Sequence, residues 1–125
     1  MKNKLNAFTL IELLVVMAII ATLLTLAVPR YFRSIDRSKE AVLKQDLGVM
    51  RDAIDKYFSD TGKYPVVLED LVQKKYLRNV PPDPITESPV TWLVIPPADA
   101  SMGGVYDVRS GATGSALDGT AYSEW

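Results

Sequence analysis

Cysteine and histidine are both absent from this 125-residue chain. Without cysteine no disulfide can cross-link the fold, and without histidine the chain lacks the commonest general base and metal ligand. The sequence also shows no paired nucleophile and base, and no glycine-rich loop of the kind that binds phosphate. These absences argue against catalysis, and we predict a protein that is not an enzyme.

An excess of positive charge is also missing, because 14 basic residues stand against 15 acidic ones. A chain with a slightly negative net charge is a poor candidate for general nucleic-acid binding, so no nucleic acid is expected among its partners. The length leaves room for one small domain beside a hydrophobic segment, and not for two domains.

A long apolar run follows a short basic leader. Residues Phe8 to Val28 are apolar except at Thr9, Glu12, Thr22 and Thr25. As a helix the run would be about 30 Å long, which is enough to cross a hydrocarbon core. A cleaved secretory signal would be shorter and would have its small-residue cleavage site behind it. Here the small residue before a plausible cut is Ala7, so the predicted processing site lies ahead of the run.

Glu12 is a carboxylate inside this run. A charge at the bilayer centre costs about 2–3.5 kcal/mol, and a partner charge is the usual compensation. Cleavage after Ala7 would leave an α-amine on Phe8, with a reference pKa of about 7.7–8, roughly one helical turn from Glu12. Stacked copies would pair these charges in a medium of low dielectric constant. The alternative is an ordinary signal anchor in which Glu12 reaches toward the interface.

The leader and the start of the run resemble the class III leader of type IV pilins and type II secretion pseudopilins. The resemblance rests on Lys2, Lys4 and Ala7, followed by Phe8-Thr9-Leu10-Ile11-Glu12. It implies that a prepilin peptidase cuts between Ala7 and Phe8 and N-methylates Phe8. It also implies that Glu12 neutralises the Phe8 amine of a neighbouring subunit during assembly. The family usually has glycine before the cut; Ala7 is small enough that cleavage is still expected.

Membrane orientation is not decided by charge alone. Lys2 and Lys4 precede the run, but four basic residues follow it closely, namely Arg30, Arg33, Arg37 and Lys39. Counting them favours the opposite orientation from the one that the resemblance implies. The resemblance implies a single-pass protein of the inner membrane with its C-terminal domain in the periplasm.

A helical apolar pattern continues beyond the run. Its positions recur every three or four residues, at Leu43, Leu47, Met50, Ile54 and Tyr57 or Phe58. The pairs Glu40–Lys44 and Asp52–Lys56 have the spacing of helical ion pairs. Gly62 can adopt the left-handed conformation that follows a helix end. The pattern predicts one long helix from Phe8 to about Asp60, with its first half in lipid and its second half packed on a domain.

Pro29 lies inside this predicted helix, where proline removes a hydrogen bond at a cost of about 3 kcal/mol. It marks either a boundary between two helices or a kink in one continuous helix. Related pilins carry a proline at this position, and the resemblance therefore favours a kink.

A basic surface can form near this proline from Arg30, Arg33, Arg37 and Lys44. It either faces solvent or lipid headgroups, or meets acids of another subunit such as Asp36, Glu40 or Asp46.

The amino-acid composition changes after Gly62, because seven of the eight prolines lie beyond Tyr64. A short helix is predicted over Val67–Lys75, and a strand over Val90–Ile95. Val105–Arg109 is the expected partner strand, and Trp92 is an expected core residue. The predicted fold is α+β and pilin-like, with a long helix packed on a small antiparallel sheet.

This C-terminal half resembles the major pseudopilin group of type II secretion. The matching strings are Gly62-Lys63-Tyr64-Pro65, Tyr76-Leu77, Pro82-Asp83-Pro84, Tyr106-Asp107-Val108-Arg109-Ser110-Gly111 and Glu124-Trp125. Members of the group typically bind calcium in the loop after this strand. Here the matching stretch is Ala112-Thr113-Gly114, which lacks an expected carboxylate, although Asp107 and Asp118 remain. We therefore predict no cofactor, with calcium as the alternative.

The resemblance implies a pseudopilus subunit with four segments: a cleaved leader (1–7), a filament-core helix (8–28), its amphipathic continuation (29–61) and a small β-rich region (62–125). Its implied partners are further copies in a helical filament, the peptidase, an assembly platform with its ATPase, and minor pseudopilins. The filament would drive export of folded proteins. Two alternatives are a type IV pilus or competence pilin, and a tethered binding module that never polymerises.

Overall fold

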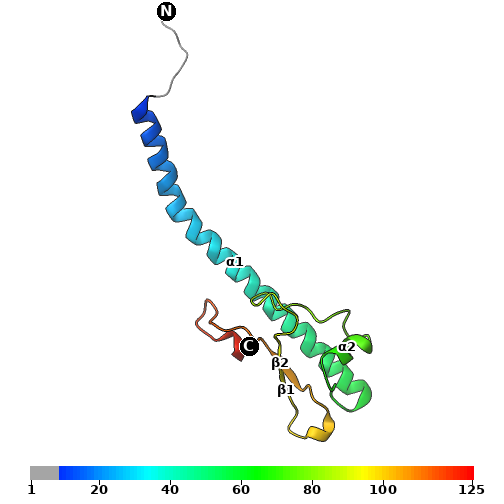
Figure 1. Cartoon of the computed structure of the whole chain (residues 1–125). Helices are drawn as coiled ribbons and strands as arrows, with labels where there is room; N and C mark the ends of the chain where they lie inside the picture. Colours follow the sequence, from blue (N-terminus) through cyan, green and yellow to red (C-terminus); the bar gives the residue numbers. More distant parts are fainter. Residues whose placement is uncertain (1–8) are drawn as a thin grey trace, which may run out of the picture. The chain divides into compact units, whose positions relative to one another are not determined.

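The computed structural model describes residues 9–125. Its order of elements is a long helix, a short helix, and two short strands with a 3₁₀ helix between them and another after them (Figure 1). The contacts separate two compact units, one reaching to Ile35 and the other running from Asp36 to Trp125. We describe each unit by itself.

Helix α1 extends over Leu10–Thr61 and contains Pro29. The chain is therefore helical on both sides of this proline, as expected for a continuous helix. The helix stops where the sequence predicts, because Gly62 has a φ of 76° and its N–H donates to the Phe58 carbonyl at 2.8 Å. A glycine in this conformation satisfies a carbonyl at the helix end that would otherwise have no donor.

The C-terminal unit has its core on one face of α1. The predicted stripe is confirmed: Leu43, Leu47, Met50 and Ile54 are each at most 2% exposed. Tyr57 and Phe58 at its end are half-buried. Trp92 is buried as expected, and its indole N–H donates to the Pro81 carbonyl at 2.8 Å. Residues from the short second helix, from the sheet region and from the C-terminal segment complete the core, among them Leu71, Val105, Val108, Ala112 and Tyr122.

Helix α2 is shorter than expected, covering Glu69–Gln73 rather than Val67–Lys75. The Asp70 carboxylate explains the late start, because it accepts the Val66 and Val67 N–H groups at 3.0 and 3.3 Å and holds both residues in a turn. The early end follows from Lys75, whose φ of 67° is incompatible with a right-handed helix.

The sheet consists of β1 (Leu93–Ile95) and β2 (Asp107–Arg109), paired antiparallel with Val94 opposite Val108. Both strands are shorter than predicted. Before β1, the Thr91 hydroxyl bonds to Thr86 and Ser88, and the Thr91 carbonyl lies so close to Gly111 that a Cβ there would be 1.8 Å away. Before β2, the Val105 N–H donates to Pro65 instead of a strand partner.

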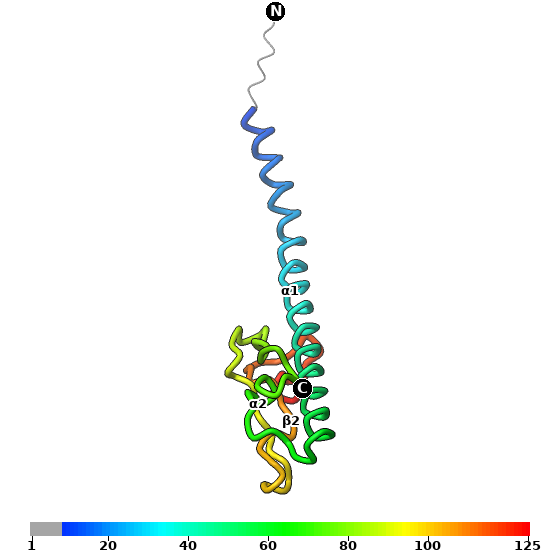
Figure 2. The backbone as a smooth tube through the Cα atoms, turned by 90° about the vertical axis from the view of Figure 1, so that its right-hand side faces the viewer, coloured from blue at the N-terminus to red at the C-terminus, as the bar shows by residue number. Residues whose placement is uncertain are grey.

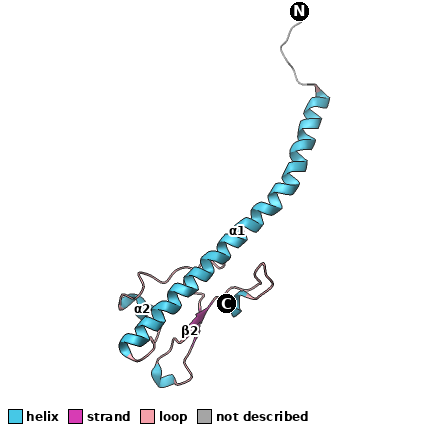
Figure 3. Cartoon of the chain, turned by 180° about the vertical axis from the view of Figure 1, so that it is seen from behind, coloured by secondary structure: helices cyan, strands magenta, loops and turns pink. Residues whose placement is uncertain are grey.

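Most of residues 62–125 lie in turns and loops, as Figure 3 shows. The C-terminal segment ends in the 3₁₀ helix η2 (Tyr122–Glu124), and it lies beside the part of α1 that belongs to the same unit (Figure 2). An α+β fold with a long helix on a small antiparallel sheet is therefore confirmed.

One of the two predicted helical ion pairs is present. Asp52 and Lys56 are 3.0 Å apart on the exposed surface. The Glu40–Lys44 pair was predicted wrongly, because both side chains turn to the C-terminal segment. Glu40 accepts the Leu117 N–H at 2.7 Å and the Tyr122 hydroxyl at 3.1 Å, while the Lys44 ammonium lies 4.7 Å from the Trp125 ring centroid.

Candidate functional site

The start of α1 is organised by Thr9 and Glu12. The Glu12 N–H donates to Thr9 Oγ1 at 3.1 Å, and the Thr9 N–H lies 3.5 Å from Glu12 Oε2. This reciprocal arrangement is a capping box, in which each side chain serves a backbone donor of the first turn. The carboxylate also lies at the positive end of the helix dipole. The Thr-x-x-Glu spacing was visible in the sequence, but sequence reasoning assigned Glu12 only to assembly.

Among residues 9–125, Glu12 Oε1 has no hydrogen-bond partner. The cap therefore occupies one oxygen through a long contact and leaves the other free for a second donor. An N–H donor or an ammonium group placed at the start of the helix could bind there without breaking the contact between Thr9 Oγ1 and the Glu12 N–H.

The helix beyond Glu12 presents an apolar surface that no other part of the described chain covers. Its most apolar stretch is exposed throughout, and this is the one described helix that is long and apolar enough to span a membrane. Thr22 and Thr25 do not interrupt that surface, because their hydroxyls donate to the Ala18 and Thr22 carbonyls at 2.8 and 2.6 Å. Exposed apolar area of this extent marks contact with a membrane or with protein.

Ala7 and Phe8, predicted as the cleavage site and as the methylated residue, lie outside the described residues. Cleavage, methylation and the pairing of Phe8 with Glu12 therefore remain predictions. Pro29 lies within α1, and the kink predicted there likewise remains a prediction.

The four basic residues that the sequence placed on one surface have different surroundings in the structure. Arg30, Arg33 and Arg37 are exposed, and none of them takes part in the ion pairs found among residues 9–125. Lys44 instead lies over Trp125 of its own chain. Of the acids suggested as partners in another subunit, Glu40 is excluded because it is buried and bonded within its own unit.

The residues considered for calcium do not fit that ion. Asp107 Oδ1 binds the Arg51 guanidinium at 2.8 Å, and Asp118 Oδ1 accepts the Thr120 N–H and hydroxyl at 3.0 and 2.6 Å. Calcium requires six to eight oxygen ligands, and no group of three acidic side chains converges within residues 9–125. The loop after β2 is held instead by Glu40 and Arg51, and the latter also donates to the Val108 and Trp125 carbonyls.

Sequence reasoning quoted Asp83 only within the string Pro82-Asp83-Pro84 and gave it no role, but in the structure this residue is fully buried. Its Oδ2 accepts the Ser110 hydroxyl at 2.5 Å, and its Oδ1 accepts the Ile85 N–H at 2.8 Å. The same carboxylate acts on Asp46 of α1, whose pKa is raised by burial and then by repulsion from Asp83. Asp83 therefore joins the loop to the strand region, a role for which the sequence pattern offers no signal.

Comparisons with known proteins found one matching family and several similar proteins. A family described as "Prokaryotic N-terminal methylation motif" matches residues 2–28. The type II secretion system core protein G of Pseudomonas aeruginosa is 35% identical over 95 residues, covering 63% of this chain and 67% of that protein. The core protein G of Aeromonas hydrophila is 27% identical, covering 66% of this chain and 69% of that protein.

Fimbrial proteins match over a smaller share of their length. The type IV major fimbrial protein FimA of Dichelobacter nodosus is 41% identical over 63 residues, which cover 50% of this chain and 39% of that protein. No solved structure matches the chain.

Proposed function

Since the chain belongs to the type IV pilin-like family, whose members are structural and not enzymatic, we propose that it is a subunit of a type II secretion pseudopilus. One observation favours the secretion pseudopilus over the type IV pilus. The similarity to core protein G covers about two thirds of that protein, whereas the similarity to FimA covers well under half of the fimbrial protein. The resemblance of the C-terminal strings to the major pseudopilins supports the same choice.

In this proposal the newly made subunit is first inserted into the inner membrane. The apolar part of α1 is the membrane anchor, and the unit from Asp36 onward is its periplasmic part. A prepilin peptidase removes residues 1–7 and methylates Phe8. An ATPase, acting through a membrane platform, then adds the subunit to a filament that drives folded proteins across the outer membrane, with minor pseudopilins as further components.

Glu12 has a defined task in this proposal. Among residues 9–125 of a single copy, its carboxylate is contacted by the Thr9 N–H at the start of its own helix. A neighbouring subunit that brings its Phe8 amine to Glu12 adds a full opposite charge inside an apolar helix bundle, where Coulomb attraction is strong. Copies out of register leave both charges without a partner, so the pairing favours one stagger between subunits.

The test is the set of proteins exported by a strain that lacks this chain, compared with its parent. In the deletion strain we expect specific folded proteins to be missing from the medium and to accumulate in the periplasm. Re-expression of the chain should restore their export. An unchanged set of exported proteins would contradict the secretion role.

A type IV pilus or competence pilin is the second candidate, favoured by the similarity to FimA. This role predicts long fibres on the cell surface that contain the chain, with loss of adhesion, motility or DNA uptake in the deletion strain. Electron microscopy of surface fibres, with antibodies against the chain, separates the two roles.

A further inference from the structure

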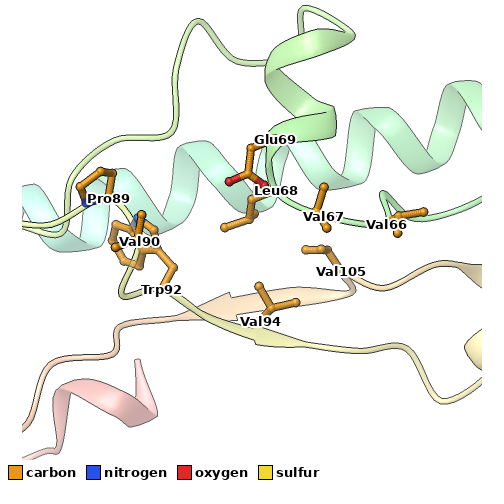
Figure 4. A pocket seen from close by; sticks show the side chains of 9 residues that line it. All are labelled: Val66, Val67, Leu68, Glu69, Pro89, Val90, Trp92, Val94 and Val105. Carbon is orange, nitrogen blue, oxygen red and sulfur yellow. The ribbon is translucent and has the colours of Figure 1, made fainter.

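An apolar groove lies between the α2 side and the sheet of the C-terminal unit, and we call it the valine groove. Its floor is made of Leu68, Trp92 and Val105, each at most 7% exposed. Its walls are Val66, Val90 and Val94, which are 69%, 84% and 42% exposed. The groove has a volume of about 320 Å³. Figure 4 shows the side chains that line it.

Glu69 is the one charged side chain that lines the valine groove, and it lies beside Leu68 on the α2 side (Figure 4). It is exposed, and neither of the two ion pairs found among residues 9–125 involves it. The groove thus combines exposed aliphatic walls with one free negative charge. Its chemical complement is an apolar side chain with a basic neighbour, since complementary charges set the register of an interface.

This complement is present on the chain itself, just beyond its apolar run. Tyr31 and Phe32 are 65% and 60% exposed, and their rings meet edge to face with centroids 5.9 Å apart. Arg30 and Arg33 flank the two rings on the helix and have no ion-pair partner in the described chain. The other strongly exposed aromatic side chain among residues 9–125, Tyr106, precedes an acid, Asp107, and does not offer this combination.

We propose that the valine groove receives Phe32 of a second copy of the chain, with Arg33 of that copy pairing with Glu69. The inference rests on the proposed function, in which copies polymerise. The groove and the aromatic pair are different surfaces, so the contact is heterologous, and a heterologous contact whose rotation does not close propagates into an open helical filament. An aromatic anchor in a pocket with an arginine beside it is also the composition typical of interface hot spots.

Disulfide trapping tests this contact directly, because the chain has no cysteine of its own. Phe32→Cys and Val90→Cys are introduced together into the full chain, filaments are assembled in cells, and the sample is oxidised. We expect a ladder of covalent multimers on a non-reducing gel. A matched control combines Phe32→Cys with Leu117→Cys, since Leu117 is 50% exposed but does not line the groove. That pair should give no ladder.

Charge reversal supplies a second readout that needs no thiol. Glu69→Arg and Arg33→Glu should each lower the yield of sheared filaments about tenfold, because like charges meet at the contact. The two changes combined should restore the yield to within about twofold. Asp55→Arg, a reversal at another exposed acid of the same unit, is the control expected to leave filaments intact.

The outcomes are separable. Filaments without the cross-link, an equal ladder from the control pair, or a cross-link to a different protein would each overturn the proposed contact and leave the polymer itself standing. If the double cysteine variant fails to assemble, charge rescue decides: restored yield supports the contact, and no rescue refutes it. A parent chain that forms no filaments would instead contradict the proposed function.

Discussion

At the scale of single residues, Glu12 has one task that the structure shows and a second that is proposed for assembly. Its side chain and that of Thr9 cap α1 within one copy, which requires an acceptor but not a charge. The proposed assembly step requires the charge as well. Glutamine also completes capping boxes and is nearly the same size, so it retains the first task and removes the second.

We therefore predict that Glu12→Gln is inserted and processed like the parent, yet assembles poorly. Thr9→Val is the matched control, because it weakens the cap at a cost of about 1 kcal/mol but keeps the carboxylate, and it should still assemble. The measurement is the ratio of filament-associated to membrane-resident chain after shearing. Equal assembly by Glu12→Gln and the parent would show that the charge is not needed.

Asp46 provides a pH dependence that can be assigned to one residue. Burial, and then the charge of Asp83, raise the pKa of Asp46 in the folded chain above its ordinary value of 3.8. The folded state then binds the proton more tightly than the unfolded state, so stability falls as pH rises through the interval between the two values. Above that interval the penalty stays constant.

Asp46→Asn should consequently raise the unfolding temperature at pH 7. The difference from the parent should shrink below pH about 3, where Asp46 is protonated in both states. Trp92 and Trp125 both lie in the C-terminal unit, so tryptophan fluorescence of the detergent-solubilised chain reports its unfolding. The exposed Asp55→Asn is the control, and a gain independent of pH would contradict the assigned cause.

At the scale of elements, α1 is continuous through Pro29 although proline cannot donate to the Thr25 carbonyl one turn earlier. The Thr25 hydroxyl does not replace that donor, because it is directed to the Thr22 carbonyl. The helix therefore carries a weak point just before the arginines. A local weakness of this kind lets a helix bend or loosen when subunits pack together.

Pro29→Ala should straighten this region and strengthen it by restoring one backbone hydrogen bond. We expect slower amide exchange for residues 25–33 and stiffer, less extensible filaments, with subunit insertion unchanged. Ala27→Gly should have the opposite effect, because glycine destabilises the same helical turn by about 1 kcal/mol. Filaments of unchanged extensibility from Pro29→Ala would remove the proline from any mechanical role.

At the scale of the whole molecule, the C-terminal segment is held on its own unit by side chains of α1. Glu40 binds Leu117 and Tyr122, and Arg51 binds Asp107, Val108 and Trp125. Burial, and then the hydrogen bond that it donates to the Glu40 carboxylate, raise the pKa of Tyr122. These contacts fix the segment where the pseudopilin group typically uses calcium.

We predict that the unfolding temperature of the C-terminal unit does not change with calcium or a chelator. A site saturated a hundredfold above its dissociation constant would add about 2.7 kcal/mol, which fluorescence melting detects readily. Glu40→Ala should instead destabilise the unit by about 1–3 kcal/mol, because the buried Tyr122 hydroxyl and the partly buried Leu117 N–H lose their acceptor. Stabilisation of the parent chain by calcium would contradict this account.

The sequence by itself determined the long helix, its apolar stripe, its end at Gly62 and the place of the sheet. Each of these follows from local periodicity, or from a residue such as Gly62 that readily adopts a left-handed backbone conformation. Only the tertiary structure decided the partners of Glu40, Lys44 and Asp83, because their contacts join residues 27 to 82 positions apart. It also decided that Val66, Val90 and Val94 stay exposed while Val105 is buried, since burial depends on which neighbours the folded chain brings to each side chain.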